Sequence, residues 1–228
     1  MESKNLKIRA SMVGKIMTNP RKSGEYLSQT AKTYIQEIAI EQKYGIKKEF
    51  WSRYTQKGIN VEDESIALVN DVLDVGFIYK NEEYFENDFV KGTPDVITDN
   101  LIIDVKSSYD ATTFPFFDTE VPNDGYFYQM QTYMWLCDKP KALLCYCLVN
   151  TPMQIVEDEV RKEHWRQYKI DEDAEVREYI EKKHNFDHIP KQNRIKVFEI
   201  ERDNLVIDKI KERVDLARLY YKQILETL

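Results

Sequence analysis

The sequence has 228 residues, of which 42% are hydrophobic and 32% charged, and no apolar run approaches the ~18 residues of a membrane span. This composition excludes an intrinsically disordered chain and a membrane protein with several spans, and the N-terminal segment lacks the apolar core of a secretion signal, so we expect one cytoplasmic domain over residues 1–228. The net charge of -7, from 33 basic and 40 acidic residues, taken alone argues against a nucleic-acid partner.

Helices are predicted in the first third of the chain, where apolar residues recur at helical spacing. A short helix is expected over Ser11–Met17, before a loop that contains proline and glycine. A longer helix is expected over Ser28–Lys43, with Gly45 at its end. A third is expected from Ile59 to Leu73, before Gly76.

After residue 76 the pattern changes to short apolar runs, which predict a sheet. Strands are expected at Phe77–Tyr79, Phe89–Val90, Val96–Ile97, Leu101–Val105, Lys141–Val149 and Ile195–Ile200. The other expected elements are a loop over 107–125, a buried helix over Tyr126–Leu136, a charged helical segment at about 157–191 and a closing helix over Asp203–Leu225. The predicted fold is therefore α/β, with a central mixed β-sheet flanked by helices.

The two strands around Asp99-Asn100 carry the most informative pattern in the chain. If these two residues form a hairpin turn, every facing pair of positions sums to 199, and Asp95 faces Asp104. Two carboxylates that face each other on one side of a sheet repel, and a divalent cation between them removes the conflict. Lys106 lies two residues beyond Asp104, hence on the same face, where it could orient or deprotonate a metal-bound water.

An alternative is that Asp-x-Lys forms an ordinary surface salt bridge, as it usually does when it occurs alone. The conjunction of Gly-x-Pro-Asp, a short hairpin and an apolar strand that ends in Asp-x-Lys favours a functional site. Glu62 adds a third acid, because it shares one helical face with apolar residues at Ile66, Val69 and Leu73. The alternative for Glu62 is a first-turn acid that the helix dipole favours. Oxygen ligands without a nearby histidine indicate Mg²⁺ or Mn²⁺ rather than zinc.

The charge is distributed unevenly along the chain. Residues 1–22 carry six basic side chains and one acidic side chain, whereas acidic residues cluster at 62–64, 82–88 and 171–175. A basic entry beside an acidic centre suits a phosphate substrate that is cut with the help of metal ions.

Four blocks of the chain resemble, in the same order, the viral recombination exonucleases of the PD-(D/E)xK nuclease superfamily, typified by lambda exonuclease. They are Arg9-Ala-Ser11-Met-Val-Gly, Gln56-Lys57-Gly-Ile-Asn-Val-Glu62-Asp-Glu, Gly92-Thr-Pro-Asp95 through Asp104-Val-Lys106, and Tyr128-Gln129-Met-Gln131-Thr-Tyr-Met-Trp135. The resemblance spans nearly the whole chain and is most specific in the second to fourth blocks. It implies a restriction-endonuclease-like core formed by a single nuclease domain.

The resemblance implies a site with two Mg²⁺ ions, for which Mn²⁺ can substitute. By this resemblance, Asp95, Asp104 and the backbone carbonyl of Val105 would hold one ion, and Glu62 would help Asp95 to hold the second. Lys106 would position the attacking water. The family often has Glu at the position of Asp104, and Asp is an allowed variant of the motif.

The resemblance also implies roles for polar residues around these ligands. Gln129 or Gln131 would hold the water or the metal shell, and the alternative for each is a satisfied buried amide. Ser11, Lys4 and Arg9 would bind the 5′-phosphate of DNA, although Ser11 could equally be a helix N-cap. The family's phosphate-binding arginine falls near Lys4 here, which weakens the expected preference for phosphorylated 5′ ends.

The function implied is metal-dependent 5′→3′ exonuclease activity on linear double-stranded DNA in phage recombination, releasing nucleotides and leaving a 3′ single strand. The resemblance further implies a homotrimeric ring and a partner protein that anneals single strands. Two alternatives stay open: an endonuclease or single-strand nuclease on the same core, and an inactive DNA-binding relative.

Overall fold

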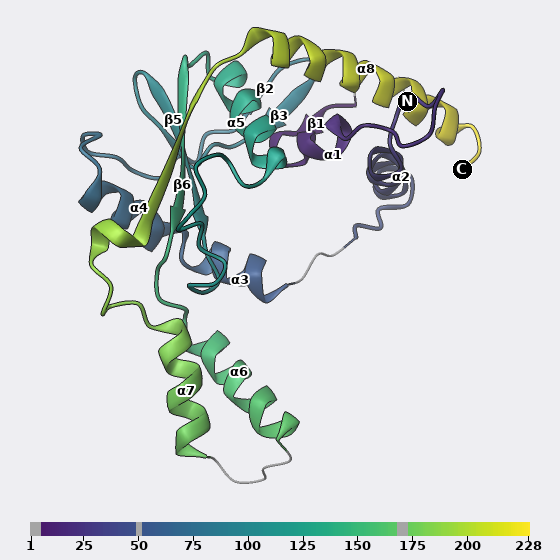
Figure 1. The fold of residues 1–228 in the computed structure, drawn as a ribbon. Helices are drawn as coiled ribbons and strands as arrows, with labels where there is room; N and C mark the ends of the chain where they lie inside the picture. The colour runs from purple at the N-terminus through teal and green to yellow at the C-terminus, as the bar shows by residue number, and fades with distance from the viewer. Residues whose placement is uncertain (1–5, 49–51, 168–172) are drawn as a thin grey trace.

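The central sheet has four strands in the order β4-β5-β6-β7. In the computed structural model, which describes residues 6–48, 52–167 and 173–228, these strands are β4 (Val96–Ile97), β5 (Leu101–Ser107), β6 (Lys141–Cys147) and β7 (Ile195–Glu201). The β5 and β6 strands are parallel and the other two pairings are antiparallel, so the sheet is mixed (Figure 1). The prediction of a central mixed sheet is therefore confirmed.

The hairpin between β4 and β5 has the register that the sequence predicts. The backbone N–H of Thr98 donates to the carbonyl oxygen of Leu101 at 2.9 Å, which closes the turn at Asp99-Asn100. The strands pair Val96 with Ile103 and Ile97 with Ile102. Both pairs sum to 199, so Asp95 lies opposite Asp104.

Helices cover both faces of the central sheet. Alternate residues of β5 and β6, including Ile103 and Val105, pack against α4 (Glu62–Val72). The intervening residues, including Ile102, pack against α5 (Asp124–Leu136) on the other face. Because side chains alternate along a strand, Asp104 and Lys106 lie on the α5 face.

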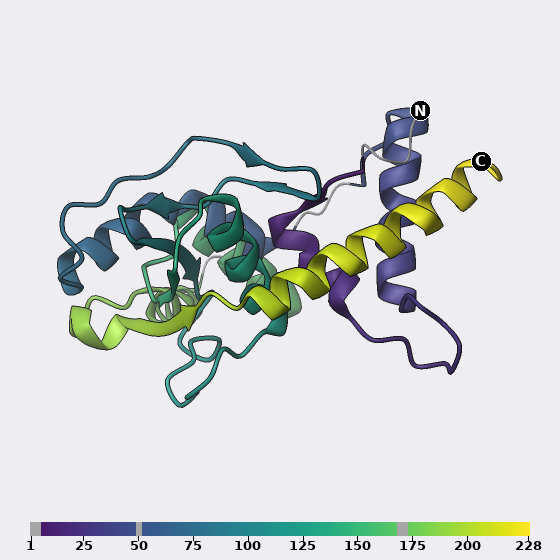
Figure 2. The ribbon, with the colours of Figure 1, turned by 90° about the horizontal axis from the view of Figure 1, so that it is seen from above.

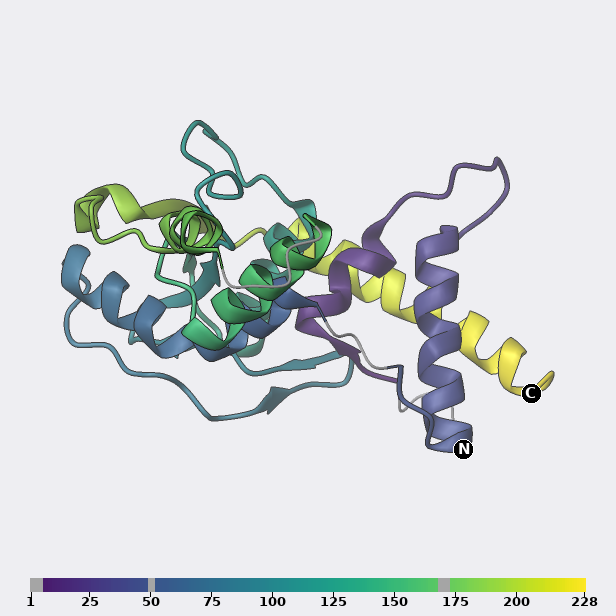
Figure 3. The same cartoon turned by 90° about the horizontal axis from the view of Figure 1, so that it is seen from below.

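A second, smaller sheet and three helices form a separate apolar core. The sheet has the order β1-β3-β2, with β1 (Ile8–Arg9), β3 (Val90–Gly92) and β2 (Phe85–Glu86). The helices are α1 (Val13–Met17), α2 (Gln29–Tyr44) and α8 (Asn204–Leu225). Figures 2 and 3 show α8 crossing α2 at the end of the molecule away from α4. The 3₁₀ helix Ala10–Met12 precedes α1 and leads the chain toward α5.

Both long helices of this core have the capping residues that their sequences predict. The Ser28 hydroxyl accepts the backbone N–H of Ala31 at 3.0 Å, and Gly45 ends α2 with a positive φ of 68°. The Asp203 carboxylate caps α8 by accepting the backbone N–H of Leu205 at 2.8 Å. The predicted bounds of these helices are confirmed within one residue.

The predicted helix from Ile59 to Leu73 is wrong at its start. The chain instead forms α3 (Arg53–Asn60) and then α4, and Val61 separates the two helices with a non-helical φ of -118° and ψ of 20°. The Val61 side chain is buried, so the break between the two helices directs an apolar side chain toward the core. Ser52 caps α3 through a hydrogen bond from the Thr55 backbone N–H at 3.1 Å.

The strand predictions for the middle of the chain are partly wrong. Phe77–Tyr79 lies outside any strand, and the side chains of Phe77 and Tyr79 are 87% and 72% exposed. The predicted strand at Phe89–Val90 is shifted to β3, and the two-residue strands β1 and β2 were not predicted. Each of these two strands contains one apolar and one charged residue, so neither shows the apolar run from which the other strands were predicted.

The charged segment predicted at 157–191 contains a helical hairpin. Helices α6 (Met153–Arg166) and α7 (Ala174–His184) project from the body of the molecule below the sheet (Figure 1). Val156, Val160 and Ile180 form a small apolar cluster between them. A 3₁₀ helix, Lys191–Arg194, then leads into β7.

None of the helices in the described ranges is both long enough and apolar enough to cross a bilayer.

Candidate active site

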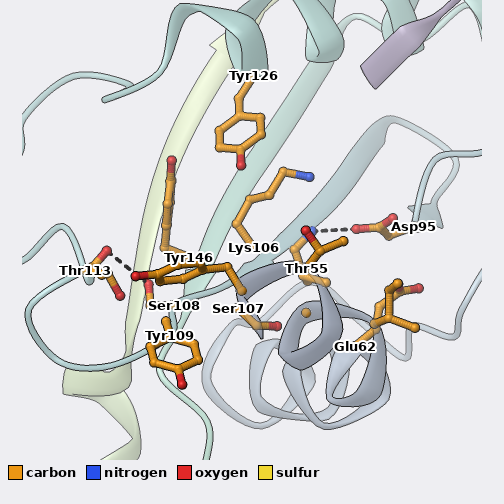
Figure 4. A pocket seen from close by; sticks show the side chains of 14 residues that line it. Thr55, Glu62, Asp95, Lys106, Ser107, Ser108, Tyr109, Thr113, Tyr126 and Tyr146 are labelled. Atoms are coloured by element: carbon orange, nitrogen blue, oxygen red, sulfur yellow. Dashed lines mark hydrogen bonds between the residues drawn. The ribbon is translucent and has the colours of Figure 1, made fainter. Parts of the chain in front are cut away.

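A pocket of about 440 Å³ opens beside the C-terminal end of β5. Residues from α3, α4, the segment before β4, β5, the loop after β5, α5 and β6 line it, among them Glu62, Asp95, Lys106, Tyr109 and Tyr126. Figure 4 shows Lys106 and Tyr126 close together, with Asp95 to one side of them. The Lys106 ammonium lies 4.9 Å from the centre of the Tyr126 ring.

The facing aspartates form the deepest part of this site. Asp104 is completely buried, and Lys106 places its ammonium against Asp104 Oδ2. Asp104 Oδ1 accepts a hydrogen bond from Gln129 Nε2 at 3.4 Å. Asp95 is half-buried, and its Oδ2 accepts the backbone N–H of Val105 at 2.8 Å. The hairpin therefore brings two carboxylates and one ammonium together, as the sequence predicts.

The environment of the aspartates opposes their ionisation. Burial, together with the charge of Asp104, raises the pKa of Asp95 to about 8. Burial also raises the pKa of Asp104, while Lys106 acts in the opposite direction. For Lys106, burial alone would lower the pKa, but the two carboxylates outweigh it and the pKa is raised. The lysine therefore stays protonated and can act as a hydrogen-bond donor.

Asp95→Asn is expected to raise the melting temperature of the protein in EDTA, by an amount that depends on pH. The folded-state pKa of Asp95 is raised from 3.8 to about 8, so its contribution to stability is present below about pH 4 and is lost as the pH rises through 8. The asparagine does not titrate, so the difference from wild type should grow between these pH values, to several degrees. Calorimetric scans from pH 4 to 9 measure it, and a difference that shrinks with pH contradicts the expectation.

Glu62 approaches the pocket from α4, which covers the opposite face of the sheet from Asp104. Its carboxylate is half-buried, and Oε1 lies 3.0 Å from the ammonium of Lys80. The same ammonium lies 3.5 Å from Asp63 Oδ1. Glu62 therefore lines the same pocket as Asp95, but its charge is paired with a lysine that the sequence did not single out.

The two aspartates provide the kind of oxygen ligands that Mg²⁺ and Mn²⁺ prefer. Asp104 Oδ2 is buried and its partner is the Lys106 ammonium, so a divalent cation that binds this oxygen would share it with Lys106 or displace the ammonium. In the described parts of the chain, however, no three His, Cys, Asp or Glu side chains gather closely enough to hold a metal ion. The aspartate pair fits a divalent cation, and Glu62 would have to leave Lys80 to join it.

The structure separates the two candidate glutamines. Gln129 lies in the site, because its amide contacts both Asp104 and the hydroxyl of Tyr133, at 3.1 Å. Gln131 points toward the end of β7 and the start of α8. Its Nε2 donates to the Glu201 carbonyl oxygen at 2.7 Å, and its Oε1 accepts the Asp203 backbone N–H at 2.8 Å. Gln131 is thus a fully satisfied buried amide that holds the start of α8.

Gln131→Leu is expected to lower stability without lowering the activity of the folded protein. The substitution removes two part-buried hydrogen bonds to the backbone of Glu201 and Asp203, which costs about 1–2 kcal/mol. Urea unfolding measures this loss, and the rate of DNA digestion per folded molecule should stay within about twofold of wild type. A large loss of rate at unchanged stability would place Gln131 in the catalytic machinery.

Ser11 lies in a second pocket, of about 520 Å³, together with Lys15, Thr18 and Asn123. Tyr126 lines both this pocket and the first, so the two adjoin. Ser11 lies within the 3₁₀ helix, and its side chain makes no capping hydrogen bond, so the alternative that it is an N-cap is wrong.

The structure describes one of the other two residues of the predicted phosphate site, and it does not place that residue in the pocket with Ser11. Arg9 is exposed on β1, where its neighbour across the sheet is Lys91, and it does not line the second pocket. Lys4 lies outside the described residues.

Lys57 is a residue that sequence reasoning missed, although it lies within a block of the resemblance. Its side chain is fully buried, and Nζ donates to the carbonyl oxygen of Tyr109 at 2.9 Å. Burial lowers the pKa of Lys57 to about 7. The hydrogen bond to its carbonyl oxygen holds Tyr109 in the loop after β5, and the Tyr109 side chain lines the candidate active site. A lysine on the apolar side of a short helix is the sequence signal that could have indicated this role.

The sequence matches no protein-family model and no curated protein. Solved structures do match it. A phage-related exonuclease from Haemophilus somnus 129PT superposes with a TM-score of 0.81 and 32% sequence identity, covering 98% of this chain and 96% of that chain. An alkaline exonuclease, LHK-Exo, from Laribacter hongkongensis superposes with a TM-score of 0.66 and 17% identity over 97% of this chain and 90% of that chain. The same enzyme in complex with dAMP gives a TM-score of 0.65, 17% identity, and coverage of 99% and 92%.

Proposed function

The chain belongs to the viral recombination exonucleases of the PD-(D/E)xK superfamily, and from this membership we propose that it is a magnesium-dependent 5′→3′ exonuclease on linear double-stranded DNA. The observation that carries the proposal is the arrangement of Asp95, Asp104 and Lys106 at the end of β5. Two facing carboxylates, one buried and one half-buried, with one ammonium beside them destabilise a purely structural hairpin and suit a cation and a phosphate. During recombination the enzyme would digest one strand of the duplex, release nucleotides and leave a 3′ single strand.

Each residue of the pocket would have a separate task. Asp95, Asp104, the Val105 carbonyl oxygen and Glu62 would hold two Mg²⁺ ions, for which Mn²⁺ can substitute; such ions supply activation of a water molecule and stabilisation of the leaving oxygen. Lys106 would hold the attacking water by donating a hydrogen bond, because its raised pKa keeps it charged.

Gln129 and Tyr133 would fix the orientation of Asp104. The Gln129 amide donates toward both the carboxylate and the tyrosine hydroxyl, so it limits rotation of the aspartate. An oriented ligand loses less conformational entropy when it binds its cation. Gln129 is therefore proposed as a positioning residue.

The 5′ end of the DNA would lie in the second pocket. Ser11 offers a hydroxyl donor there, and Lys15 adds a positive charge from the next turn of the chain. The shared residue Tyr126 lies between this pocket and the aspartates. A phosphate in one pocket would thus leave the adjacent phosphodiester beside the other.

The test uses a blunt linear duplex labelled separately at its 5′ and 3′ ends, with Mg²⁺ or EDTA, beside closed circular DNA of the same sequence. The proposal expects mononucleotides to be released from the 5′ label first, only with Mg²⁺, while the circle stays intact. Nicking of the circle would indicate an endonuclease on the same core. Retained binding without cleavage would indicate an inactive DNA-binding relative.

Two parts of the resemblance concern partners. A homotrimeric ring would enclose the DNA, and a single-strand annealing protein would take over the 3′ strand. Both stay predictions. Light scattering of the purified protein measures the mass of the assembly and so tests the homotrimer. Co-purification with a single-strand annealing protein tests the predicted partner.

A further inference from the structure

Lys80 lies on the irregular segment between α4 and β2 and reaches back to the first turn of α4. Its ammonium is 3.0 Å from Glu62 Oε1 and 3.5 Å from Asp63 Oδ1. Glu62 lines the candidate active site, whereas Asp63 is exposed beside it. Lys80 therefore places a second ammonium at the edge of the carboxylate cluster, in addition to Lys106.

The backbone next to Lys80 is hydrogen-bonded to the segment that leads into β4 and carries Asp95. The backbone N–H of Asn81 donates to the carbonyl oxygen of Asp95 at 2.7 Å. The Asn81 side-chain amide donates to the carbonyl oxygen of Pro94 at 2.9 Å. These two hydrogen bonds hold the base of the Lys80 side chain at a fixed place relative to the aspartates. The Lys80 side chain therefore reaches Glu62 from a backbone position that the fold fixes beside the site.

The charges explain what this pairing does to the site. Glu62 is close enough to raise the pKa of both Asp95 and Asp104 through its negative charge. Lys80 offsets this charge, because its ammonium lies 3.0 Å from Glu62 Oε1. A carboxylate can pair with an ammonium or bind a cation directly, and each partner occupies its lone pairs.

We infer that Lys80 competes with a divalent cation for Glu62, and so sets the cation concentration at which the site fills. Lys80 is thus a positioning residue that acts through Glu62. The inference rests on the proposed metal-dependent function, and it adds a residue that regulates that same site. The cation must displace the Lys80 ammonium before Glu62 can bind the cation together with Asp95.

Isothermal titration of Mn²⁺ into wild-type protein and Lys80→Gln, without DNA, tests the competition. A partly exposed ion pair is worth at most a few-fold in an equilibrium constant, so Lys80→Gln should bind Mn²⁺ about three- to fivefold more tightly. Lys80→Arg keeps the positive charge and should stay within about twofold of wild type. Melting curves in EDTA confirm that each variant is folded.

Lys191→Gln is the matched control for removing a lysine that pairs with α4. Lys191 lies 2.6 Å from Asp71 near the other end of the same helix, and both side chains are exposed. Its loss should leave Mn²⁺ binding unchanged. Equal tightening in Lys80→Gln and Lys191→Gln would reflect net charge alone and would overturn the inference.

The coupling to Glu62 is measured by a double-substitution cycle. In a Glu62→Gln background, the further change Lys80→Gln should no longer alter the dissociation constant, because the ligand for which Lys80 competes is gone. An undiminished effect in that background would overturn the inference. If wild type binds Mn²⁺ and Lys80→Gln binds it no more tightly, this inference alone fails; if wild type binds no Mn²⁺, the proposed metal dependence fails with it.

Discussion

Asp104→Asn is expected to lower Mg²⁺-dependent digestion of linear duplex DNA about a thousandfold, which corresponds to about 4 kcal/mol of transition-state stabilisation. Asp104 is the most deeply buried carboxylate of the site and the one on which Lys106 and Gln129 converge. The substitution keeps the shape of the side chain and removes the charge that a cation requires. Rates of nucleotide release at saturating DNA measure the loss.

The same substitution should not destabilise the fold. Burial raises the pKa of Asp104, so a neutral amide relieves an unfavourable charge at neutral and alkaline pH. Asp99→Asn is the matched control, because Asp99 is an exposed carboxylate in the turn of the same hairpin. Its digestion rate should stay within about twofold of wild type. Full activity of Asp104→Asn would remove this residue from the catalytic machinery.

The hairpin could be predicted from sequence because its information is local. A two-residue turn fixes the register of both strands, and the register alone places Asp95 opposite Asp104. The strand period then places Lys106 on the same face. None of these steps depends on a residue that is distant in the chain.

The roles of the two glutamines could not be separated from sequence, for a physical reason. The helix that carries them is apolar on nearly all sides, so its pattern does not tell which side chain meets β5 and which meets the end of β7 and the start of α8. The structure decides it: Gln129 faces Asp104, whereas Gln131, two residues on, faces Glu201.

Two other residues depend on contacts across the fold. Helix α3 contains Gly58 and two β-branched residues, Thr55 and Ile59, which give it weak helical propensity. It is held by the buried contact of Lys57 with Tyr109. Lys80 meets Glu62 from a segment without regular structure, where no periodicity places its side chain. Such contacts form only when the segments assemble, so the sequence pattern does not contain them.

Lys106→Gln is expected to slow digestion of linear duplex DNA by about a hundred- to a thousandfold, because the site loses the charged donor that holds the attacking water. Its effect on stability should have the opposite sign to that of Asp104→Asn. The ammonium lowers the pKa of Asp95 and Asp104, so its removal leaves two buried carboxylates without a cation. Digestion rates and calorimetric scans in EDTA measure the two effects.

The pH dependence follows from the partners of Lys106. The raised pKa of the lysine keeps its charge up to alkaline pH, but its stabilising effect requires ionised carboxylates, and Asp95 ionises only at about pH 8. The loss of melting temperature in Lys106→Gln should therefore be larger at pH 9 than at pH 5, and Mn²⁺ should reduce it by supplying the missing positive charge. Lys141→Gln, which removes a surface pair with Glu199 on the same sheet, should show neither the loss of rate nor this pH dependence. A loss that is equal at both pH values would mean that Lys106 supports the fold by packing, and that its charge is not what balances the aspartates.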